Sequence, residues 1–76
     1  WGIQVGAFSV ASEARDAASS AAIIAPGELS NASVEVSSTS NNGREVHRAR
    51  LQNLSEEQAR QACRKIIAAS ESCFVY

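Results

Sequence analysis

The sequence predicts an α+β fold with the element order βαββαβ, in which a four-stranded antiparallel sheet carries two helices on one face. Three observations predict it. Four stretches alternate apolar and polar residues, and two stretches between them repeat small apolar residues at helical spacing. Asn42-Gly43, the strongest short hairpin signal, joins the second and third strands. Ser55 and Gln58 are the ends of a capping-box sequence that begins the second helix.

The first strand spans residues 1–8, WGIQVGAF. Ile3 and Val5 alternate with Gln4 and Gly6, which is typical of a strand with one face on a core and one face open. The Gln4 amide offers two donor hydrogens and an acceptor oxygen to a polar ligand. Gly6 on the same face would leave bare backbone for close approach. We therefore expect a central strand whose open face binds a ligand.

The first helix is expected over residues 12–25. Ser9 and Ser12 are its candidate N-caps, and alanines repeat every three or four positions along it. Such a stripe of small residues suits a helix that packs closely on a sheet. Pro26-Gly27 then ends the helix.

The second and third strands, residues 33–40 and 44–51, are expected to pair as a hairpin whose two-residue turn sets the register. The core-face pairs are Val34 with Leu51, Val36 with Ala49 and Ser38 with His47. The open-face pairs are Glu35 with Arg50, Ser37 with Arg48 and Thr39 with Val46. Because this register keeps the apolar residues together, the pattern supports the hairpin independently of the turn.

The second helix is expected over residues 55–70, and the last strand over residues 72–76. The inward stripe of this helix is Ala59, Ala62, Cys63, Ile66 and Ile67. Alternation in the last strand places Phe74 and Tyr76 on the open face. There the two aromatic rings either shield the edge of the sheet or stack on sugar rings.

The two cysteines lie at positions where they can meet. Cys63 belongs to the inward stripe of the second helix, and Cys73 lies on the helix-facing side of the last strand. A single pair in a small domain is compatible with one disulfide in an oxidising compartment, and two buried thiols are the alternative. The placement favours a disulfide between Cys63 and Cys73.

The predicted element order also sets the neighbours across the sheet. In the ferredoxin-like and RNP-like version of this order, the first and third strands lie together at the centre. Gln4 and Arg48 are then neighbours on the open face. Arg48 and Arg50 have a second interpretation, in which they pair with Glu35 and keep the sheet soluble.

Composition excludes several classes of partner. The 76 residues include 8 acidic residues and 7 Lys or Arg, with a formal net charge of −1 and no basic run. Nucleic acids and acidic membranes are therefore excluded, because proteins bind them through clustered Lys and Arg. No segment is long and apolar enough to insert into a membrane. One histidine and two cysteines do not supply a zinc site, and we expect no cofactor.

Two other functions that occur on this topology, RNA binding and catalysis on phosphates, are not supported, because the motifs they require are absent. RNA-binding sheets carry stacked aromatics on the first and third strands, and an enzyme acting on phosphates needs a Gly-rich loop, which is absent. The open-face positions of those strands are Gln4, Gly6, Val46, Arg48 and Arg50. We expect a non-catalytic, monomeric domain spanning residues 1–76. Its start at Trp1 indicates a domain excised or processed from a larger protein.

Several motifs taken together resemble one family. The first strand reads Ile3-Gln4-Val5-Gly6-Ala7-Phe8, and an Asn-Gly hairpin leads into HRARLQNL. SEEQA begins the second helix, and the last strand carries a cysteine. Over essentially its whole length the chain resembles the SPOR (sporulation-related repeat) domain. The most specific match is the first strand, where the family has apolar, Gln, apolar, Gly, small and Phe.

The resemblance implies a peptidoglycan-binding module of the bacterial periplasm and cell envelope. Such domains recognise glycan strands stripped of their stem peptides and are often septal, because amidases work at the division septum. Members usually form one end of a larger envelope protein. Any catalysis, such as that of a D-Ala-D-Ala carboxypeptidase or a lytic transglycosylase, would belong to another part of that protein.

The candidate ligand-binding residues come partly from this resemblance and partly from position. The residues carried over from the family are Gln4, Ala7, Val46, Arg48 and Phe74. Arg50 joins them from its place on the open face. Two departures bear on the site: Gln52-Asn53-Leu54 replaces the usual Gly-Pro turn, and Val46 replaces an aromatic of some members. The alternative function is a protein–protein interaction module of the envelope with the same fold.

Overall fold

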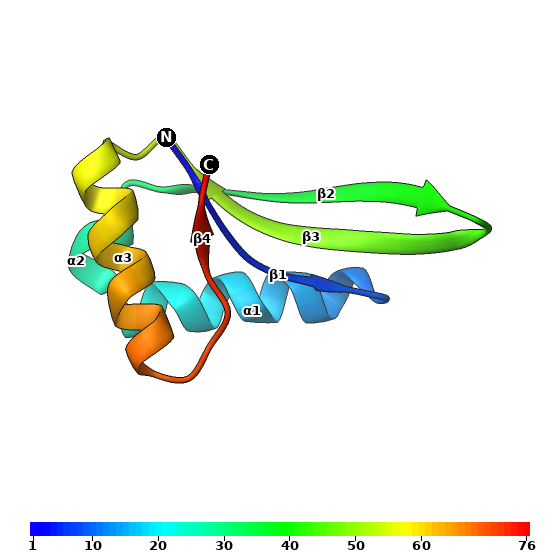
Figure 1. The fold of residues 1–76 in the computed structure, drawn as a ribbon, viewed down its shortest axis with the longest axis horizontal. Helices are drawn as coiled ribbons and strands as arrows, with labels where there is room; N and C mark the ends of the chain where they lie inside the picture. The colour runs from blue at the N-terminus through cyan, green and yellow to red at the C-terminus, as the bar shows by residue number, and fades with distance from the viewer.

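A computed structural model describes residues 1–76 and contains one four-stranded antiparallel sheet with the order β2-β3-β1-β4 (Figure 1). Along the chain the elements are β1 (Ile3–Phe8), α1 (Ala11–Ile24), α2 (Pro26–Leu29), β2 (Ser33–Asn41), β3 (Arg44–Gln52), α3 (Glu56–Ala68) and β4 (Phe74–Val75). The α+β class and the central position of the first and third strands are thus confirmed. The two ends of the chain lie side by side, since Gly2 and Tyr76 exchange backbone hydrogen bonds of 3.2 and 3.0 Å.

The long hairpin β2–β3 has the register that the sequence predicts, and all six predicted pairs are present. Asn42 and Gly43 both adopt positive φ angles, 52° and 76°, as a type I′ turn requires. The tip of the hairpin projects beyond the helices in Figure 1. Val34 was expected in the core but is 56% exposed. It lies on the edge strand, whereas α1 packs chiefly on β1 and β3.

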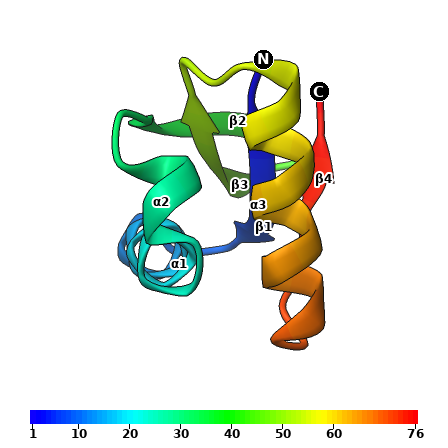
Figure 2. The same cartoon turned by 90° about the vertical axis from the view of Figure 1, so that its left-hand side faces the viewer.

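The core lies between the sheet and the helices, and small residues let these layers approach closely. Ala14, Ala18 and Ala21 of α1 are buried, as are Ala59 and Ala62 of α3. The largest fully buried side chains are those of Ile3, Leu51 and Ile66. Figure 2, in which α1 is seen end-on, shows α3 running alongside β4.

The boundaries of the first helix differ from the expectation. Helix α1 begins at Ala11 after Val10, which makes no capping hydrogen bond through its side chain, so neither Ser9 nor Ser12 is the N-cap. The Pro26-Gly27 pair does follow the end of α1, but Pro26 also begins the short helix α2, which the sequence analysis missed. Proline suits the first position of a helix because its missing N–H has no partner there.

Helix α3 begins at the predicted capping box. The Gln58 backbone N–H donates to Ser55 Oγ at 3.1 Å, and the Ser55 N–H donates to Gln58 Oε1 at 3.0 Å. The inward stripe is narrower than expected, because Ile67 is 58% exposed. One residue beyond Ile66 on a helix lies about 100° further round the axis, which here points it to solvent.

The predicted disulfide is present. Cys63 of α3 and Cys73, which directly precedes β4, are bonded, with 5.3 Å between their Cα atoms and a sequence separation of 10. The bridge holds the short strand β4 against the helix that packs beside it. Since β4 is only two residues long, its place at the edge of the sheet depends on this covalent tie as well as on its pairing with β1.

An ion pair ties α2 to α3 and predicts a pH dependence of stability. Lys65 Nζ donates to Glu28 Oε1 at 3.0 Å, and this hydrogen bond lowers the pKa of Glu28 below its ordinary value of 4.5. A lowered pKa stabilises the fold above pH 4.5, and this contribution is lost as the pH falls through the folded-state pKa. We expect Glu28→Gln to be less stable than wild type at pH 7, with a difference that shrinks toward pH 3.

Urea unfolding at both pH values measures this difference. Glu57→Gln is the control for the loss of a carboxylate, because Glu57 is exposed and forms no ion pair. A pH-independent cost of Glu28→Gln would show that the ion pair with Lys65 contributes nothing.

Candidate functional site

A β-bulge in β1 decides which residues face away from the helices. Gln4 pairs with Arg50, but Gly6 pairs with Ala49, so Val5 and Gly6 together oppose one residue of β3. Gly6 has a φ of +155°, which side-chain-bearing residues rarely adopt. A Cβ there would lie 2.7 Å from the Phe8 ring. The expectation that Gly6 shares the open face with Gln4 was therefore wrong.

Beyond the bulge the alternation of β1 is reversed. Ala7 pairs with Arg48, and so it lies on the open face. Phe8 pairs with His47 and is turned toward the helices, where it packs against the core. The side of the sheet that carries Gln4, Ala7, Arg48 and Arg50 is called the open face from here on.

Arg50, and not Arg48, is the direct neighbour of Gln4. Arg50 Nε donates to Gln4 Oε1 at 3.2 Å, and its guanidinium lies 5.2 Å from the centroid of the Tyr76 ring. The Tyr76 ring in turn lies against Gly2, where a Cβ would come within 2.7 Å of it. A hydrogen bond and an aromatic ring therefore hold this guanidinium in place.

Arg48 lies one row further along the sheet, toward the hairpin. Its Nη1 donates to Thr39 Oγ1 at 2.9 Å. The one-residue insertion at the bulge brings Arg48 opposite Ala7, where a regular strand would place Gly6 opposite it. The two side chains share a face, as the sequence predicts, but they are not the adjacent pair that it predicts.

Neither open-face arginine is neutralised by a carboxylate. The three ion pairs of the structure join His47 to Glu45, Arg60 to Glu56, and Lys65 to Glu28. Glu35 lies opposite Arg50 in the register but makes no ion pair with it. The alternative interpretation, in which these arginines serve to pair with Glu35, is therefore not supported.

The strand pairings arrange the open face in rows across the sheet. One row runs through Phe74, Gln4 and Arg50, and the next through Ala7 and Arg48. The Phe74 side chain is 56% exposed at the β4 end of the first row. Val46 lies further toward the hairpin tip and is half-buried.

A family model of the SPOR domain matches residues 1–76. The chain belongs to the SPOR domain family. Among solved structures it is similar to the crystal structure of the RlpA SPOR domain from Pseudomonas aeruginosa, with 26% identity and a TM-score of 0.62. The similarity covers 99% of this chain and 97% of that one. The comparison with curated proteins found no match.

Membership of the SPOR family establishes the general function of this domain. SPOR domains are non-catalytic peptidoglycan-binding modules of the bacterial cell envelope. The Cys63–Cys73 disulfide fits that location, because disulfides persist in oxidising compartments. No helix is long and apolar enough to cross a bilayer, and no three His, Cys, Asp or Glu side chains are grouped to hold a metal.

The SPOR fold brings most of the sequence-predicted site residues together and adds one. Gln4, Arg50 and Phe74 share a row, and Ala7 and Arg48 share the next, whereas Val46 stands apart. Tyr76 was not among the expected ligand-binding residues, yet it contacts the Arg50 guanidinium. Its signal in the sequence is the alternation of the last strand, which places it on the same face as Phe74.

Proposed function

We propose that the open face of this SPOR domain binds peptidoglycan glycan strands that have lost their stem peptides. The observation that carries the proposal is the pair of arginines on this face that have no carboxylate partner, one of them held by Gln4 and Tyr76. A preorganised guanidinium on the open face of a sheet is suited to a carboxylate ligand, which it binds through charge-assisted hydrogen bonds.

The chemistry of the ligand supplies that carboxylate. An amidase that removes a stem peptide breaks its amide bond to the lactyl group of muramic acid and leaves a free carboxylate there. The stripped strand therefore carries one negative charge on each disaccharide, together with hydroxyl and acetamido groups. Arg48 and Arg50 match the carboxylates, and the Gln4 amide matches the polar groups of the sugars. An attached peptide would remove the lactyl charge and add bulk over the sheet.

The exposed aromatics offer apolar contact at one end of the face. Phe74 and Tyr76 are 56% and 44% exposed, and both lie beside the Gln4–Arg50 row. Sugar rings have apolar C–H faces that can lie on such rings. Since Val46 replaces an aromatic near the hairpin, we infer that aromatic contact here is shifted toward β4.

Septal targeting follows from the same chemistry. Amidases that separate daughter cells work at the division septum, so strands with free lactyl carboxylates are enriched there. We infer that the domain acts as a monomer, belongs to a larger envelope protein and brings that protein to the septum.

Co-sedimentation with purified sacculi tests the proposal. We expect binding to rise when an amidase has removed the stem peptides, and to fall with added salt because the face is exposed. Arg48→Ala/Arg50→Ala should weaken binding about a hundredfold or more, since charge-assisted hydrogen bonds contribute about 1.5 to 3 kcal/mol each. Chemical amidation of the lactyl carboxylates should lower wild-type binding to a similar level.

Arg64→Ala is the control for the loss of one positive charge outside the open face, to be compared with Arg48→Ala and Arg50→Ala singly. Arg64 is exposed on α3, away from the open face, and makes no ion pair. All variants must keep the wild-type circular dichroism spectrum. Binding to neither preparation of sacculi would contradict glycan recognition and would indicate a protein partner on the open face.

A further inference from the structure

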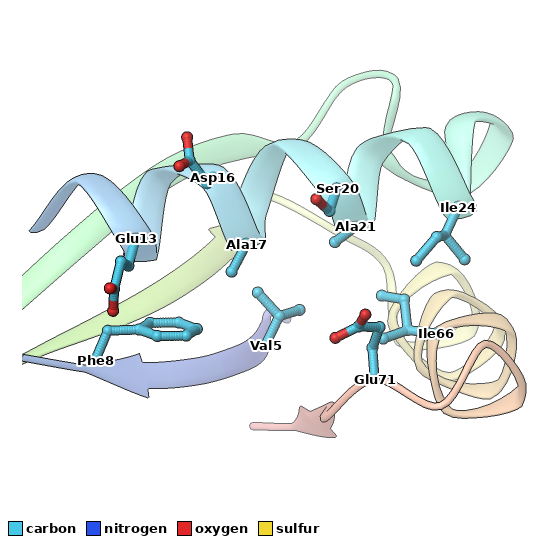
Figure 3. Close-up of a pocket in the computed structure, with 10 residues that line it drawn as sticks. All are labelled: Val5, Phe8, Glu13, Asp16, Ala17, Ser20, Ala21, Ile24, Ile66 and Glu71. Atoms are coloured by element: carbon cyan, nitrogen blue, oxygen red, sulfur yellow. The ribbon is translucent and has the colours of Figure 1, made fainter. Parts of the chain in front are cut away.

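A pocket lies on the helix side of the sheet, away from the open face. It has a volume of about 300 Å³ and is bounded by β1 below, α1 above and the C-terminal end of α3 with the segment that follows it (Figure 3). Its apolar lining consists of Val5, Phe8, Ala17, Ala21, Ile24 and Ile66. The name acidic groove is used for this pocket and its charged rim.

The bulge in β1 and the alanines of α1 create the groove. The bulge turns the Phe8 ring under α1, where it forms part of the floor next to Val5. Ala17 and Ala21 lie above them and are too small to fill the space. Ligand-binding pockets have volumes of about 300 Å³ or more. Because the volume of the groove is at this lower limit, the groove suits one large apolar side chain better than a whole cofactor.

Acidic side chains lie along the groove, and in Figure 3 the carboxylate of Asp16 points away from its floor. Glu13, Asp16 and Glu71 line the groove, and no Lys or Arg does. In Figure 3 the Glu13 carboxylate reaches down toward Phe8, and the Glu71 carboxylate lies beside Ile66 at the other end. None of the three takes part in an ion pair. The groove therefore joins an apolar lining, partly accessible at Phe8, Ala17 and Ile24, to uncompensated negative charge.

We propose that the acidic groove binds a cationic peptide segment of another protein. The segment has one large apolar side chain that enters between Phe8 and Ile66, with Lys or Arg on both sides. Charge complementarity selects this occupant, because the carboxylates of Glu13 and Glu71 stand near opposite ends of the apolar floor. The same carboxylates repel anionic ligands.

The groove and the open face carry opposite charges and use opposite sides of one sheet. Along β1 the side chain of Gln4 lies on the open face, whereas Val5 lies in the groove. A peptide in the groove would therefore leave the arginines of the open face free. In this arrangement the domain holds a protein partner while it is bound to peptidoglycan.

An NMR titration with defined peptides tests the proposal. The probe is acetyl-Lys-Lys-Phe-Lys-Lys-amide, added to the ¹⁵N-labelled disulfide-bonded domain at low ionic strength. We expect amide shifts concentrated at the groove residues of β1, α1 and the end of α3. The peptide with Ser in place of Phe should bind at least fivefold more weakly, and the peptide with Glu in place of Lys should cause no shifts.

Variants then locate the site on the domain. Glu13→Gln/Glu71→Gln should raise the Kd of the Phe peptide about tenfold, at about threefold for each partly exposed charge pair. Glu57→Gln removes an exposed, unpaired carboxylate that does not line the groove, and it should leave the Kd unchanged. Arg48→Ala/Arg50→Ala should also leave it unchanged, and Glu13→Gln/Glu71→Gln should bind sacculi as wild type does.

Several results would overturn the proposal. Equal binding of the Ser and Phe peptides, or shifts spread over all acidic residues, would mean unspecific charge attraction. Shifts confined to the open face would place the peptide there. Groove shifts that grow with domain concentration in the absence of peptide would identify a second copy of the chain as the occupant.

Discussion

Removal of the Cys63–Cys73 bridge is expected to lower the free energy of unfolding by about 2.5 kcal/mol, because the bridge closes a loop of about ten residues in the unfolded chain. For a domain of this size the corresponding fall in Tm is about 10 to 20 °C. The variant is Cys63→Ala/Cys73→Ala, measured by thermal and urea unfolding. Alanine avoids placing a hydroxyl at Cys63, which is buried.

The reduced wild-type protein is the control for this variant, because it keeps both sulfur atoms and loses only the covalent bond. We expect it to lose most of the same stability. Since β4 carries Phe74 beside Gln4, reduction should also weaken binding to amidase-treated sacculi. Reduced and oxidised proteins with equal Tm would show that the noncovalent packing of β4 suffices.

The substitution Gly6→Ala is expected to destabilise the domain by about 2 to 3 kcal/mol. The φ of +155° is strained for alanine, and the new Cβ would lie 2.7 Å from the Phe8 ring. Either the bulge or the Phe8 ring must move. The bulge determines which residues of β1 lie on the open face, and the Phe8 ring lines the acidic groove. Urea unfolding gives the stability change, and sacculus binding reports whether Ala7 and Arg48 remain aligned.

Gly27→Ala is the matched control, because a Cβ at that exposed glycine meets no atom within 4 Å. It should be neutral or slightly stabilising. The cost of Gly6→Ala should be smaller in a Phe8→Ala background, because the overlap with the ring is then absent. If Gly6→Ala and Gly27→Ala cost the same, the bulge is not a constraint on this fold.

The bulge matters for both proposed sites because it exchanges the sides of the sheet on which Ala7 and Phe8 lie. Ala7 joins the row of Arg48, and Phe8 becomes the floor of the acidic groove. A regular strand would place Phe8 on the open face and leave the groove without its aromatic wall. One glycine thus contributes to both proposed sites.

The sequence by itself determined the features that depend on local pattern. Alternation, the Asn42-Gly43 turn and the Ser55 capping box predict the order of the four strands and the two long helices, the hairpin register and the start of α3, and these are confirmed, whereas the short helix α2 was missed. The disulfide is also predicted from local pattern. Helical periodicity places Cys63 on the inward side of α3, and strand alternation places Cys73 on the side of the last strand that faces this helix. The turn and the capping box involve residues that are near one another in the chain. The other features depend on helix or strand periodicity, which the folded structure preserves.

Only the tertiary structure decided what depends on the pairing of distant strands. The pairing of β1 with β3 gives Gln4 the partner Arg50, and the bulge then shifts the register by one residue, so that Arg48 pairs with Ala7 in place of Gly6. Tyr76 reaches Arg50 because the chain ends meet at the edge of the sheet. The exposure of Val34 likewise follows from which strands the helices cover. Periodicity assigns a residue to a face, but a one-residue shift between strands reassigns its neighbours, and only the folded sheet shows that shift.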